Sequence, residues 1–372
     1  MTYLDNAATT FPKPKGILAD LNFCLKKYCG NSGRSSHALA LKTSEKIYET
    51  REEIAKLVGI SSPERVVFTY NATYALNIAI KSFIKEKCHI ITSDFEHNSV
   101  IRPLEKLRLE LGVEYSTIDT RCDLSAGLKA ALRPDTRGMV CSIASNVTGD
   151  ALPLSVLSDF AKENGLFLII DGSQAAGHME IDLKKTPCDA FCAPGHKALF
   201  GIQGSGFICF RDKFRRKSFI EGGSGSDSME VEMPILLPEG YEAGTLSAPA
   251  IVALGGGVRF IREVGIHRIE EKLDHLTSAT EERLRSIPGI TLYKKGCGIL
   301  SFNYKDLPSS VISSELDSLG ICTRGGLHCA PSIHKRLGTL DRGAVRISFS
   351  YLNKMRDIDR LYKAMRDIEK KI

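Results

Sequence analysis

Two side chains with complementary chemistry, an aspartate and a lysine, stand near the middle of the sequence. Asp171 ends the apolar run 166–170, which has the length and composition of a buried strand, and Lys197 follows Pro194, Gly195 and His196. A carboxylate buried at the end of a strand needs a partner, and a pyridinium N–H would satisfy it. A lysine amine forms a Schiff base with an aldehyde. These are the two groups by which a protein holds and tunes pyridoxal phosphate.

An ordinary reading of Asp171 is a strand-end aspartate that caps a turn. Gln174, three residues further along, and Lys197 favour the cofactor site over this reading.

A cysteine far downstream narrows the chemistry. Cys329 is preceded by a pair of glycines at 325–326 and followed by Ala330 and Pro331, which indicates an ordered turn rather than a core strand. Arg324 and His328 are close enough in sequence to lower its pKa and raise its thiolate fraction. Most cysteines are small core residues, and we interpret the other ten of the eleven in this way.

A zinc site at Cys188, Cys192 and His196 is a further hypothesis, which the spacing argues against. The segment 188–192 is expected to be a strand, in which, at ~3.3 Å per residue, the two sulfurs would lie about 13 Å apart. Zinc binds thiolates at about 2.3 Å. We therefore predict no metal site.

The composition indicates a large cytoplasmic protein. With 372 residues, 43% of them hydrophobic, the chain is long enough for two domains. No apolar run has the length of a membrane span, and the first residues lack the basic-then-apolar pattern of a signal peptide. An odd number of scattered cysteines fits a reducing compartment better than a disulfide framework.

The net charge of +6 is mild, and its densest basic run is Arg211–Lys217. We interpret this run as a solvated loop; the alternative is a docking surface for an acidic partner protein. Because the basic residues are not interleaved with aromatic ones, nucleic-acid binding is not expected.

Between about residues 40 and 210, short apolar runs alternate with amphipathic helical patterns. The expected strands are 65–69, 88–92, 138–143, 166–170 and 206–210, and the expected helices are 46–58, 73–84, one through 104–111, and 153–163. This alternation predicts an α/β fold with a mainly parallel (mixed) sheet covered by helices on both faces. Ligands of such sheets bind beyond the carboxyl ends of the strands, where Asp171, Asn146 and His97 fall.

The pattern changes after about residue 250. A long helical stretch at 251–284 precedes shorter strands and a charged final helix, which together predict a smaller C-terminal α+β domain. We expect residues 12–250 to form the large cofactor-binding domain. Residues 251–372, joined by 1–11, would form the small domain that carries the cysteine loop.

Eight short motifs are spread over nearly the whole chain. They are Tyr3–Thr10, Glu96–Asn98, Ser145–Gly149, Asp171–Gln174, Gly195–Lys197, Glu242–Thr245, Arg324–Pro331 and Val345–Ser348. Each is weak alone, but together and in this order they are specific. On these motifs the chain resembles the class V (fold type I) enzymes that use pyridoxal phosphate, in the cysteine desulfurase and selenocysteine lyase group. The turn around Cys329 resembles that of the short-loop, type II desulfurases.

The resemblance implies a role for each of several residues around the cofactor. Lys197 would bind its aldehyde, Asp171 its ring nitrogen, and Gln174 and Asn146 its phenolic oxygen. His97 would lie on the ring face and help to move protons. The phosphate would lie at a helix start, held by Ala72, Thr73 and His196. Gly244 and Thr245 would reach the phosphate of a neighbouring subunit, which implies a homodimer.

The resemblance also implies the substrate and the reaction. Arg346 would hold the α-carboxylate of the substrate by a paired hydrogen bond, although a surface arginine is an equal reading of its apolar flanks. Arg324 and Asn146 are further substrate-binding candidates. Lys197, His97 and Cys329 would convert L-cysteine to L-alanine and leave a persulfide on Cys329. That sulfur would pass to an acceptor thiol or protein, for example in iron–sulfur cluster assembly.

Two alternatives remain open. One is selenocysteine lyase, or another β-elimination or transamination of a small amino acid on the same cofactor. The other is a regulatory scaffold that binds a partner without turnover, which the presence of Asp171, Lys197 and Cys329 disfavours.

The chain also departs from the pattern of the family near the expected phosphate. Pro194 replaces a serine or threonine, which removes one hydroxyl donor. Asn71 replaces a glycine, and Tyr74 replaces a common glutamate.

Overall fold

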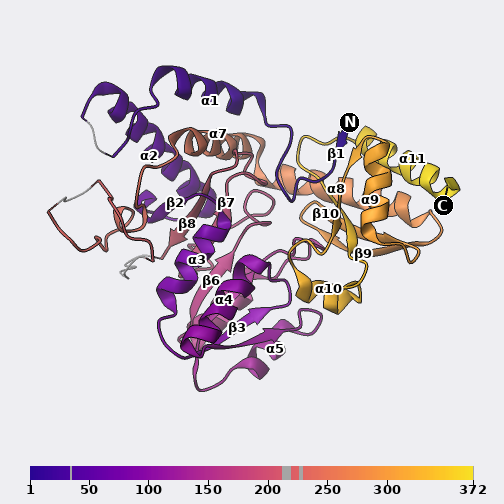
Figure 1. Ribbon diagram of the computed structural model, residues 1–372, viewed down its shortest axis with the longest axis horizontal. Coiled ribbons are helices and arrows are strands. Elements are labelled where there is room, and N and C mark those ends of the chain that lie inside the picture. The colour runs from indigo at the N-terminus through magenta and orange to yellow at the C-terminus, as the bar shows by residue number, and fades with distance from the viewer. Residues whose placement is uncertain (34–35, 212–218, 226–228, 372) are drawn as a thin grey trace.

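The computed structural model describes residues 1–33, 36–211, 219–225 and 229–371. Within these ranges the chain forms a large sheet with helices on both faces and a smaller sheet toward the C-terminus (Figure 1). Apart from Arg211, the basic run Arg211–Lys217 lies outside the described residues.

The large sheet contains seven strands of the described chain, in the order β2-β8-β7-β6-β5-β3-β4. Their bounds are β2 Val66–Thr69, β3 His89–Ser93, β4 Glu114–Ile118, β5 Thr136–Ser142, β6 Phe167–Asp171, β7 Ala190–Pro194 and β8 Gly206–Phe210. Neighbours run parallel except at β8, which is antiparallel to both β2 and β7. The predicted mainly parallel, mixed sheet is therefore confirmed.

Helices cover both faces because the central strands are apolar on both sides. Along β6, Leu168 and Ile170 pack into one apolar cluster and Ile169 into another. The helices around this sheet are α1 Lys15–Lys27, α2 Ala38–Val58, α3 Ala72–Phe83, α4 Asn98–Leu111, α5 Leu124–Ala131, α6 Leu154–Glu163 and α7 Ala248–Val264. The cluster around Ile169 includes residues of α3 and α4, and the other cluster includes residues of α2, α5, α6 and α7.

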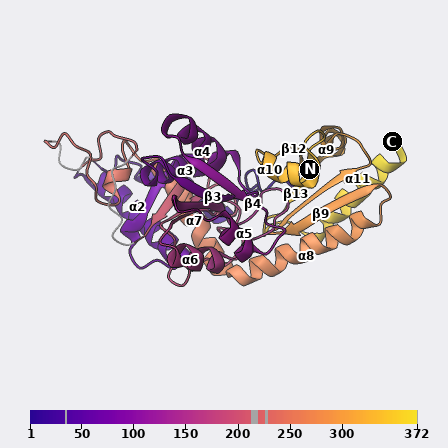
Figure 2. The ribbon, with the colours of Figure 1, turned by 90° about the horizontal axis from the view of Figure 1, so that it is seen from below.

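The smaller sheet is antiparallel, with the order β12-β13-β10-β9 among the described residues. The helices and strands of this C-terminal part are α8 Ile266–Arg285, β9 Ile290–Gly296, β10 Ile299–Tyr304, α9 Ser309–Ser318, β11 Ile321–Cys322, β12 Arg324–Gly326, α10 Pro331–Leu337, β13 Ala344–Ser348 and α11 Met355–Lys371. The long helix α8 lies along this sheet (Figure 2). The predicted C-terminal α+β unit is thus present.

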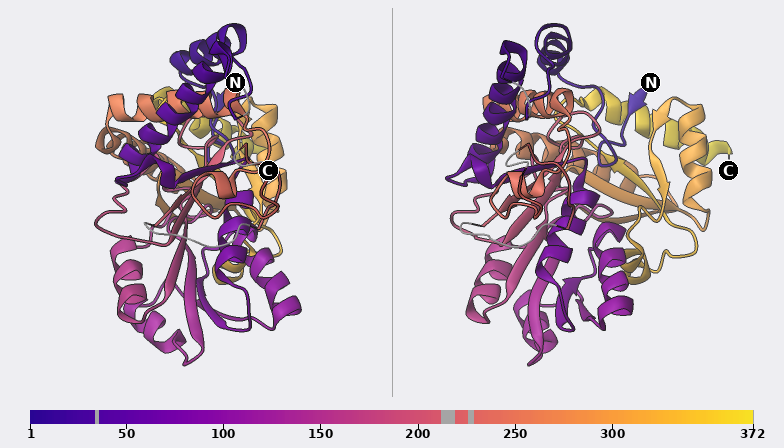
Figure 3. Two further views of the ribbon diagram at one scale, coloured as in Figure 1. Left: turned by 90° about the vertical axis from the view of Figure 1, so that its left-hand side faces the viewer. Right: turned by 60° about the vertical axis from the view of Figure 1, so that its left-hand side comes forward.

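The first residues of the chain lie against its C-terminal part. Strand β1 (Thr2–Tyr3) pairs in parallel with β11, and the N-terminus lies beside the C-terminal helices (Figure 3). This pairing supports grouping the first residues with the C-terminal unit, while the boundary at residue 250 stays a prediction.

The helical stretch predicted at 251–284 is two helices rather than one. They break at Gly265, whose φ of 88° lies in a region that glycine adopts readily. Helix α7 packs on α1 and α2, whereas α8 packs on β9. Among the described residues, no helix is both long and apolar enough to cross a membrane.

Among the α-helices and strands described in the large unit, α1, β4 and α5 have no counterpart in the sequence prediction. Strand β4 lies at the edge of the sheet, where it has one neighbour and its residues are partly exposed. Edge strands need no continuous apolar run, so Glu114–Ile118 gave no strand signal.

Candidate active site

The loops that follow the large-sheet strands meet around one cavity. Asp171 ends β6, Lys197 follows β7, Asn146 follows β5, and His97 follows β3. Eight predicted site residues line this cavity: Ala72, Thr73, His97, Asn146, Asp171, Gln174, His196 and Lys197. The parallel strands bring them together because their carboxyl ends share one edge of the sheet.

The Asp171 carboxylate is buried at this edge. Its Oδ1 accepts a hydrogen bond from the Ser173 amide at 2.9 Å, and its Oδ2 lies 3.5 Å from Ser142 Oγ. Both donors are neutral, so a cationic N–H of a ligand could still pair with the carboxylate.

A second carboxyl group, that of Glu96, lies behind Ser142. Ser142 Oγ is 2.8 Å from Glu96 Oε2, and the Ser142 amide is 2.9 Å from Oε1. Complete burial raises the pKa of Glu96 to about 7, although hydrogen bonds from Ser93 and Ser142 oppose the shift. Ser142 therefore stands between two buried acids.

Lys197 is poised to act as a nucleophilic amine. Burial lowers its pKa to about 8, while the charge of Asp171 acts in the opposite direction. A neutral amine is the form that attacks an aldehyde. The backbone of this loop is fixed by the N-terminal segment, because Thr10 Oγ1 donates to the Lys197 carbonyl at 2.5 Å and Lys13 Nζ donates to the His196 carbonyl at 3.1 Å.

His97 is a neutral imidazole whose proton position follows from its contacts. Its Nδ1 accepts a hydrogen bond from the Ser99 amide at 3.0 Å and lies 2.7 Å from Ser99 Oγ. Because an amide only donates, the ring proton is on Nε2. Burial, and then the charge of Lys197, lower the pKa of His97 to about 4. Ser99 Oγ is also 2.9 Å from Thr73 Oγ1, so the serine links His97 to the start of α3.

The residues around the cavity fit pyridoxal phosphate. Two buried polar atoms of cavity residues have no hydrogen-bond partner within the described chain, Asn146 Oδ1 and His196 Nδ1. The amides of Ala72 and Thr73 precede the first intrahelical hydrogen bond of α3, which the Ala75 amide makes, and so remain available to an anion. Gln174 is held by its amide, which donates to the Ala7 carbonyl at 3.1 Å.

The departures near the expected phosphate take definite places. Asn71 is the N-cap of α3, and its Oδ1 accepts from the Tyr74 amide at 3.0 Å. The Tyr74 ring meets that of Tyr70 edge-on, with 5.7 Å between centroids. Pro194 ends β7 and lines the cavity.

Arg324 and Arg346 stand directly opposite each other on β12 and β13. Opposed residues of an antiparallel pair point to the same face of the sheet, so two cationic side chains share one face. Arg346 is completely buried, which excludes the reading of a surface arginine. It donates to Asp5 Oδ1 at 2.8 Å and to the Asn146 carbonyl at 2.9 Å, while its Nε has no partner in the described chain.

Cys329 lies in an exposed turn next to the cavity residues. The Asn98 amide donates to the Cys329 carbonyl at 2.7 Å, and Asn146 Nδ2 donates to the His328 carbonyl at 2.7 Å. The side chain of His328 is buried, and its Nε2 is 3.0 Å from the Ala344 carbonyl. Burial holds the pKa of His328 well below its usual value. His328 is therefore uncharged, and it does not bring to the Cys329 turn the positive charge that is expected of it from the sequence.

Gly244 and Thr245 lie away from this cavity. Both line a separate hollow beside α2, and both are exposed. The segment before them is anchored by Glu242, whose carboxylate pairs with Arg51 at 2.5 Å inside the protein. Within one chain these two residues therefore do not join the other cofactor candidates.

The cysteines of the rejected zinc hypothesis take ordinary places in the sheet region. Cys192 lies on β7, with Cys188 two residues before that strand, and both thiols are buried. In the part of the chain that the structure describes, no group of three or more His, Cys, Asp or Glu side chains could hold a metal ion.

Comparison with known proteins decides the family. Residues 2–361 match the aminotransferase class-V family. The chain belongs to this family. Its members use pyridoxal phosphate, and the match covers all three sheets of the described chain.

Several relatives of this class-V chain carry names that describe an activity. A protein of Methanothermobacter thermautotrophicus named probable cysteine desulfurase is 30% identical, over 98% of this chain and 94% of its own length. A cysteine desulfurase of Klebsiella pneumoniae is 28% identical, over 100% of this chain and 94% of its own. The apo structure of cysteine desulfurase from Thermococcus onnurineus NA1 superimposes with a TM-score of 0.94 at 28% identity, covering 100% of this chain and 95% of that one.

Several contacts of this class-V site were not predicted from the sequence. They are those of Ser142, Ser99, Asp5 and Lys13, each of which touches a predicted residue through a hydrogen bond. Asp5 stands in a motif that the sequence does show, yet its partner Arg346 is 341 positions away. No local pattern could have paired them.

Proposed function

We propose that this protein is a pyridoxal-phosphate-dependent cysteine desulfurase that converts L-cysteine to L-alanine and retains the sulfur as a persulfide on Cys329. One observation carries the proposal: the cavity lined by Asp171 and Lys197 is joined by Asn146 and Asn98 to the exposed Cys329 turn. The names of the relatives agree with this activity.

The surroundings of the cavity residues are consistent with a separate role for each of them in holding the cofactor. Asp171 would pair with the ring nitrogen, and the free amides at the start of α3 would hold the phosphate. When bound, pyridoxal phosphate supplies an electron sink for bonds at the substrate α-carbon. Lys197 would hold the aldehyde and then move the α-proton, which its lowered pKa permits near neutral pH.

The two opposed arginines suit an anionic substrate. Arg324 and Arg346 lie on one sheet face with Asp5 as the counter-charge of Arg346. A carboxylate of the substrate would relieve the repulsion between the two guanidinium groups. His97, neutral with its proton on Nε2, could donate a hydrogen bond from Nε2–H to a group bound in the cavity.

Cys329 would accept the sulfur as a thiolate. The S–S bond forms as the C–S bond of the substrate breaks, the carbon keeps the bonding electrons, and it takes up a proton to become the methyl group of alanine. The persulfide then transfers its terminal sulfur to an acceptor thiol. We further propose that Gly244 and Thr245 complete the phosphate site of a second protomer in a homodimer.

The test is anaerobic incubation of the holoenzyme with L-cysteine, followed by mass spectrometry of the peptide that contains Cys329. We expect a mass gain of one sulfur atom on this peptide and none in Lys197→Ala. Alanine release that survives Cys329→Ala would contradict the proposal and favour selenocysteine lyase or another elimination. Failure of the purified protein to bind pyridoxal phosphate would favour a regulatory scaffold.

A further inference from the structure

The Cys329 turn has a backbone conformation that needs outside support. His328 and Cys329 have φ values of 51° and 58°, in the left-handed region that side chains other than glycine rarely adopt. Such residues keep this conformation only where the surrounding structure holds them. Two of the supports are the hydrogen bonds from Asn98 and Asn146.

A third support comes from the helix that follows the turn. Helix α10 (Pro331–Leu337) begins two residues after Cys329 and carries Arg336, whose side chain is only 8% exposed. Arg336 Nη1 donates to Asp94 Oδ2 at 3.0 Å and also to Thr120 Oγ1. Arg336 Nη2 lies 3.9 Å from Asp150 Oδ2.

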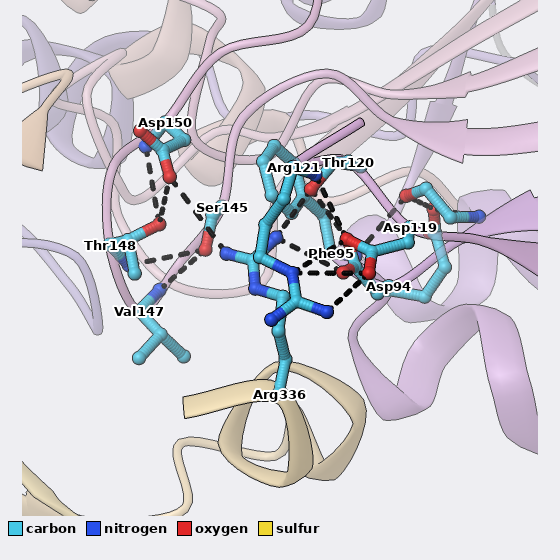
Figure 4. A network of polar contacts seen from close by, with 12 residues as sticks. Asp94, Phe95, Asp119, Thr120, Arg121, Ser145, Val147, Thr148, Asp150 and Arg336 are labelled. Carbon is cyan, nitrogen blue, oxygen red and sulfur yellow. Dashed lines mark hydrogen bonds and ion pairs between the residues drawn. The ribbon is translucent and has the colours of Figure 1, made fainter. Parts of the chain in front are cut away.

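The contacts of Arg336 come from three loops of the large sheet. Asp94 follows β3, Thr120 follows β4, and Asp150 follows β5. Figure 4 shows the arginine rising from its helix between Asp94 and Thr120 on one side and Asp150 on the other. Its guanidinium also lies over the Phe95 ring, 5.4 Å from the centroid.

The same loops hold residues of the candidate active site. Phe95 and His97 line the cavity, and Asn98, one residue further, binds the Cys329 carbonyl. Arg336 therefore ties the helix after the cysteine to the segment that presents His97.

We propose that Arg336 is a positioning residue that fixes Cys329 over the cavity for sulfur transfer. The inference rests on the proposed desulfurase activity and adds a residue to it. A nucleophile must stand within a narrow range of distance and angle, and a displacement of about 1 Å can slow a reaction about 100-fold. Arg336 limits that displacement through contacts made outside the cavity.

The test compares three variants of the full-length holoenzyme. Arg336→Met with Asp94→Asn removes the arginine together with the acid nearest to it, while Asp150, 18% exposed, keeps its hydrogen bond from the Thr148 hydroxyl. Arg336→Lys keeps the positive charge but loses the planar guanidinium group, which can donate to several acceptors at once. Arg283→Met is the control, because Arg283 pairs with Asp359 on the exposed surface of the C-terminal unit at 2.7 Å.

Two measurements separate positioning from folding. The first is the single-turnover rate of persulfide formation on Cys329 with L-cysteine, beside the KM for L-cysteine. The second is the rate of Cys329 alkylation by iodoacetamide without substrate, relative to the exposed thiols Cys29 and Cys122 in the same molecule. Bound pyridoxal phosphate and the urea midpoint are recorded for every variant.

We expect the double variant to form persulfide about 10- to 100-fold more slowly, with KM changed less than twofold. Its Cys329 alkylation ratio should change at least threefold, Arg336→Lys should be intermediate, and Arg283→Met should match the wild type. An unchanged persulfide rate and an unchanged alkylation ratio in the folded variants would overturn the inference. It would also be overturned if the rate falls only in proportion to the fall in the urea midpoint, because the variants would then merely be less stable. If the double variant does not fold, Arg336→Lys decides by the same criteria. If the wild type forms no persulfide, the desulfurase proposal fails, while the alkylation ratio still tests whether Arg336 positions Cys329.

Discussion

At the scale of single residues, the site depends on side chains whose charge is set by burial. Burial lowers the pKa of Lys197 to about 8 and that of His97 to about 4, and raises that of Glu96 to about 7. The lysine is thus partly neutral and the histidine fully neutral at physiological pH. This combination is suitable for a reaction in which the Lys197 amine attacks an aldehyde while the neutral His97 ring donates a hydrogen bond.

The lowered pKa of Lys197 predicts the pH dependence of cofactor capture. As pH rises through about 8, the amine loses its proton and becomes nucleophilic, whereas an exposed lysine would do so near 10.5. The rate at which the apo-protein binds pyridoxal phosphate covalently, followed by absorbance, should therefore rise with a midpoint near pH 8. A midpoint above pH 10 would show that Lys197 is not desolvated, and Lys197→Ala should show no covalent phase.

The arginines illustrate how one residue type takes different roles according to its surroundings. Arg346 is completely buried and divides its donors between Asp5 and the Asn146 carbonyl, which leaves Nε for a ligand. Arg336 is nearly as buried, but its contacts join elements rather than line the cavity. The sequence context of the two residues does not distinguish these roles.

At the scale of elements, the site is formed where the antiparallel sheet meets the strand ends of the large sheet. Gly149, in the loop after β5, packs against Gly296 at the end of β9. A Cβ atom at Gly149 would lie 1.9 Å from the Gly296 carbonyl oxygen, and the φ of Gly149 is 72°. Two glycines therefore permit a backbone contact that places β9 next to the loop of Asn146.

Gly149→Ala should accordingly destabilise the protein much more than the same substitution at a glycine that has a similar φ but no atoms close to its Cβ position. Gly165 is the matched control, because its φ is 64° and nothing lies within 4 Å of its Cβ position. We expect Gly165→Ala to cost about 1 kcal/mol from backbone strain alone, and Gly149→Ala at least about 2 kcal/mol more from overlap. Urea unfolding of the two variants measures the difference, and equal losses would mean that the sheets separate easily.

At the scale of the whole molecule, one chain does not gather every residue of the proposed cofactor site. Gly244 and Thr245 line a hollow other than the cavity of Lys197. The proposed homodimer would resolve this separation, because a two-fold axis can place a residue of one protomer at the site of the other.

Mixing two inactive variants tests this arrangement. In a dimer of Lys197→Ala with Thr245→Asp, the protomer that keeps Lys197 would receive an intact Thr245 from its partner. Refolding an equal mixture should restore about a quarter of the wild-type activity, since half of the dimers are mixed and each has one intact site. If both residues act within one chain, the mixture should stay as inactive as either variant alone.

Much of the architecture follows from local pattern. The buried strands around Asp171 and the helices between them are visible as apolar runs and amphipathic periods, because both faces of the central strands are covered. The sequence pattern does not indicate the edge strand β4, because an exposed edge carries little apolar signal. It also does not place a helix break at Gly265, because one glycine does not always end a helix.

The residue types and their order already specify the chemistry that is available: an aspartate at a strand end, a lysine after the next strand, and a cysteine in a glycine-flanked turn. Which neighbours these groups have depends on how distant elements pack together. The pairing of Arg324 with Arg346 depends on strand register, and the contact of Arg336 with Asp94 spans 242 positions. Such contacts arise when separate elements pack, and the free energy that selects them comes from burial and hydrogen bonding across the whole fold rather than from any local period.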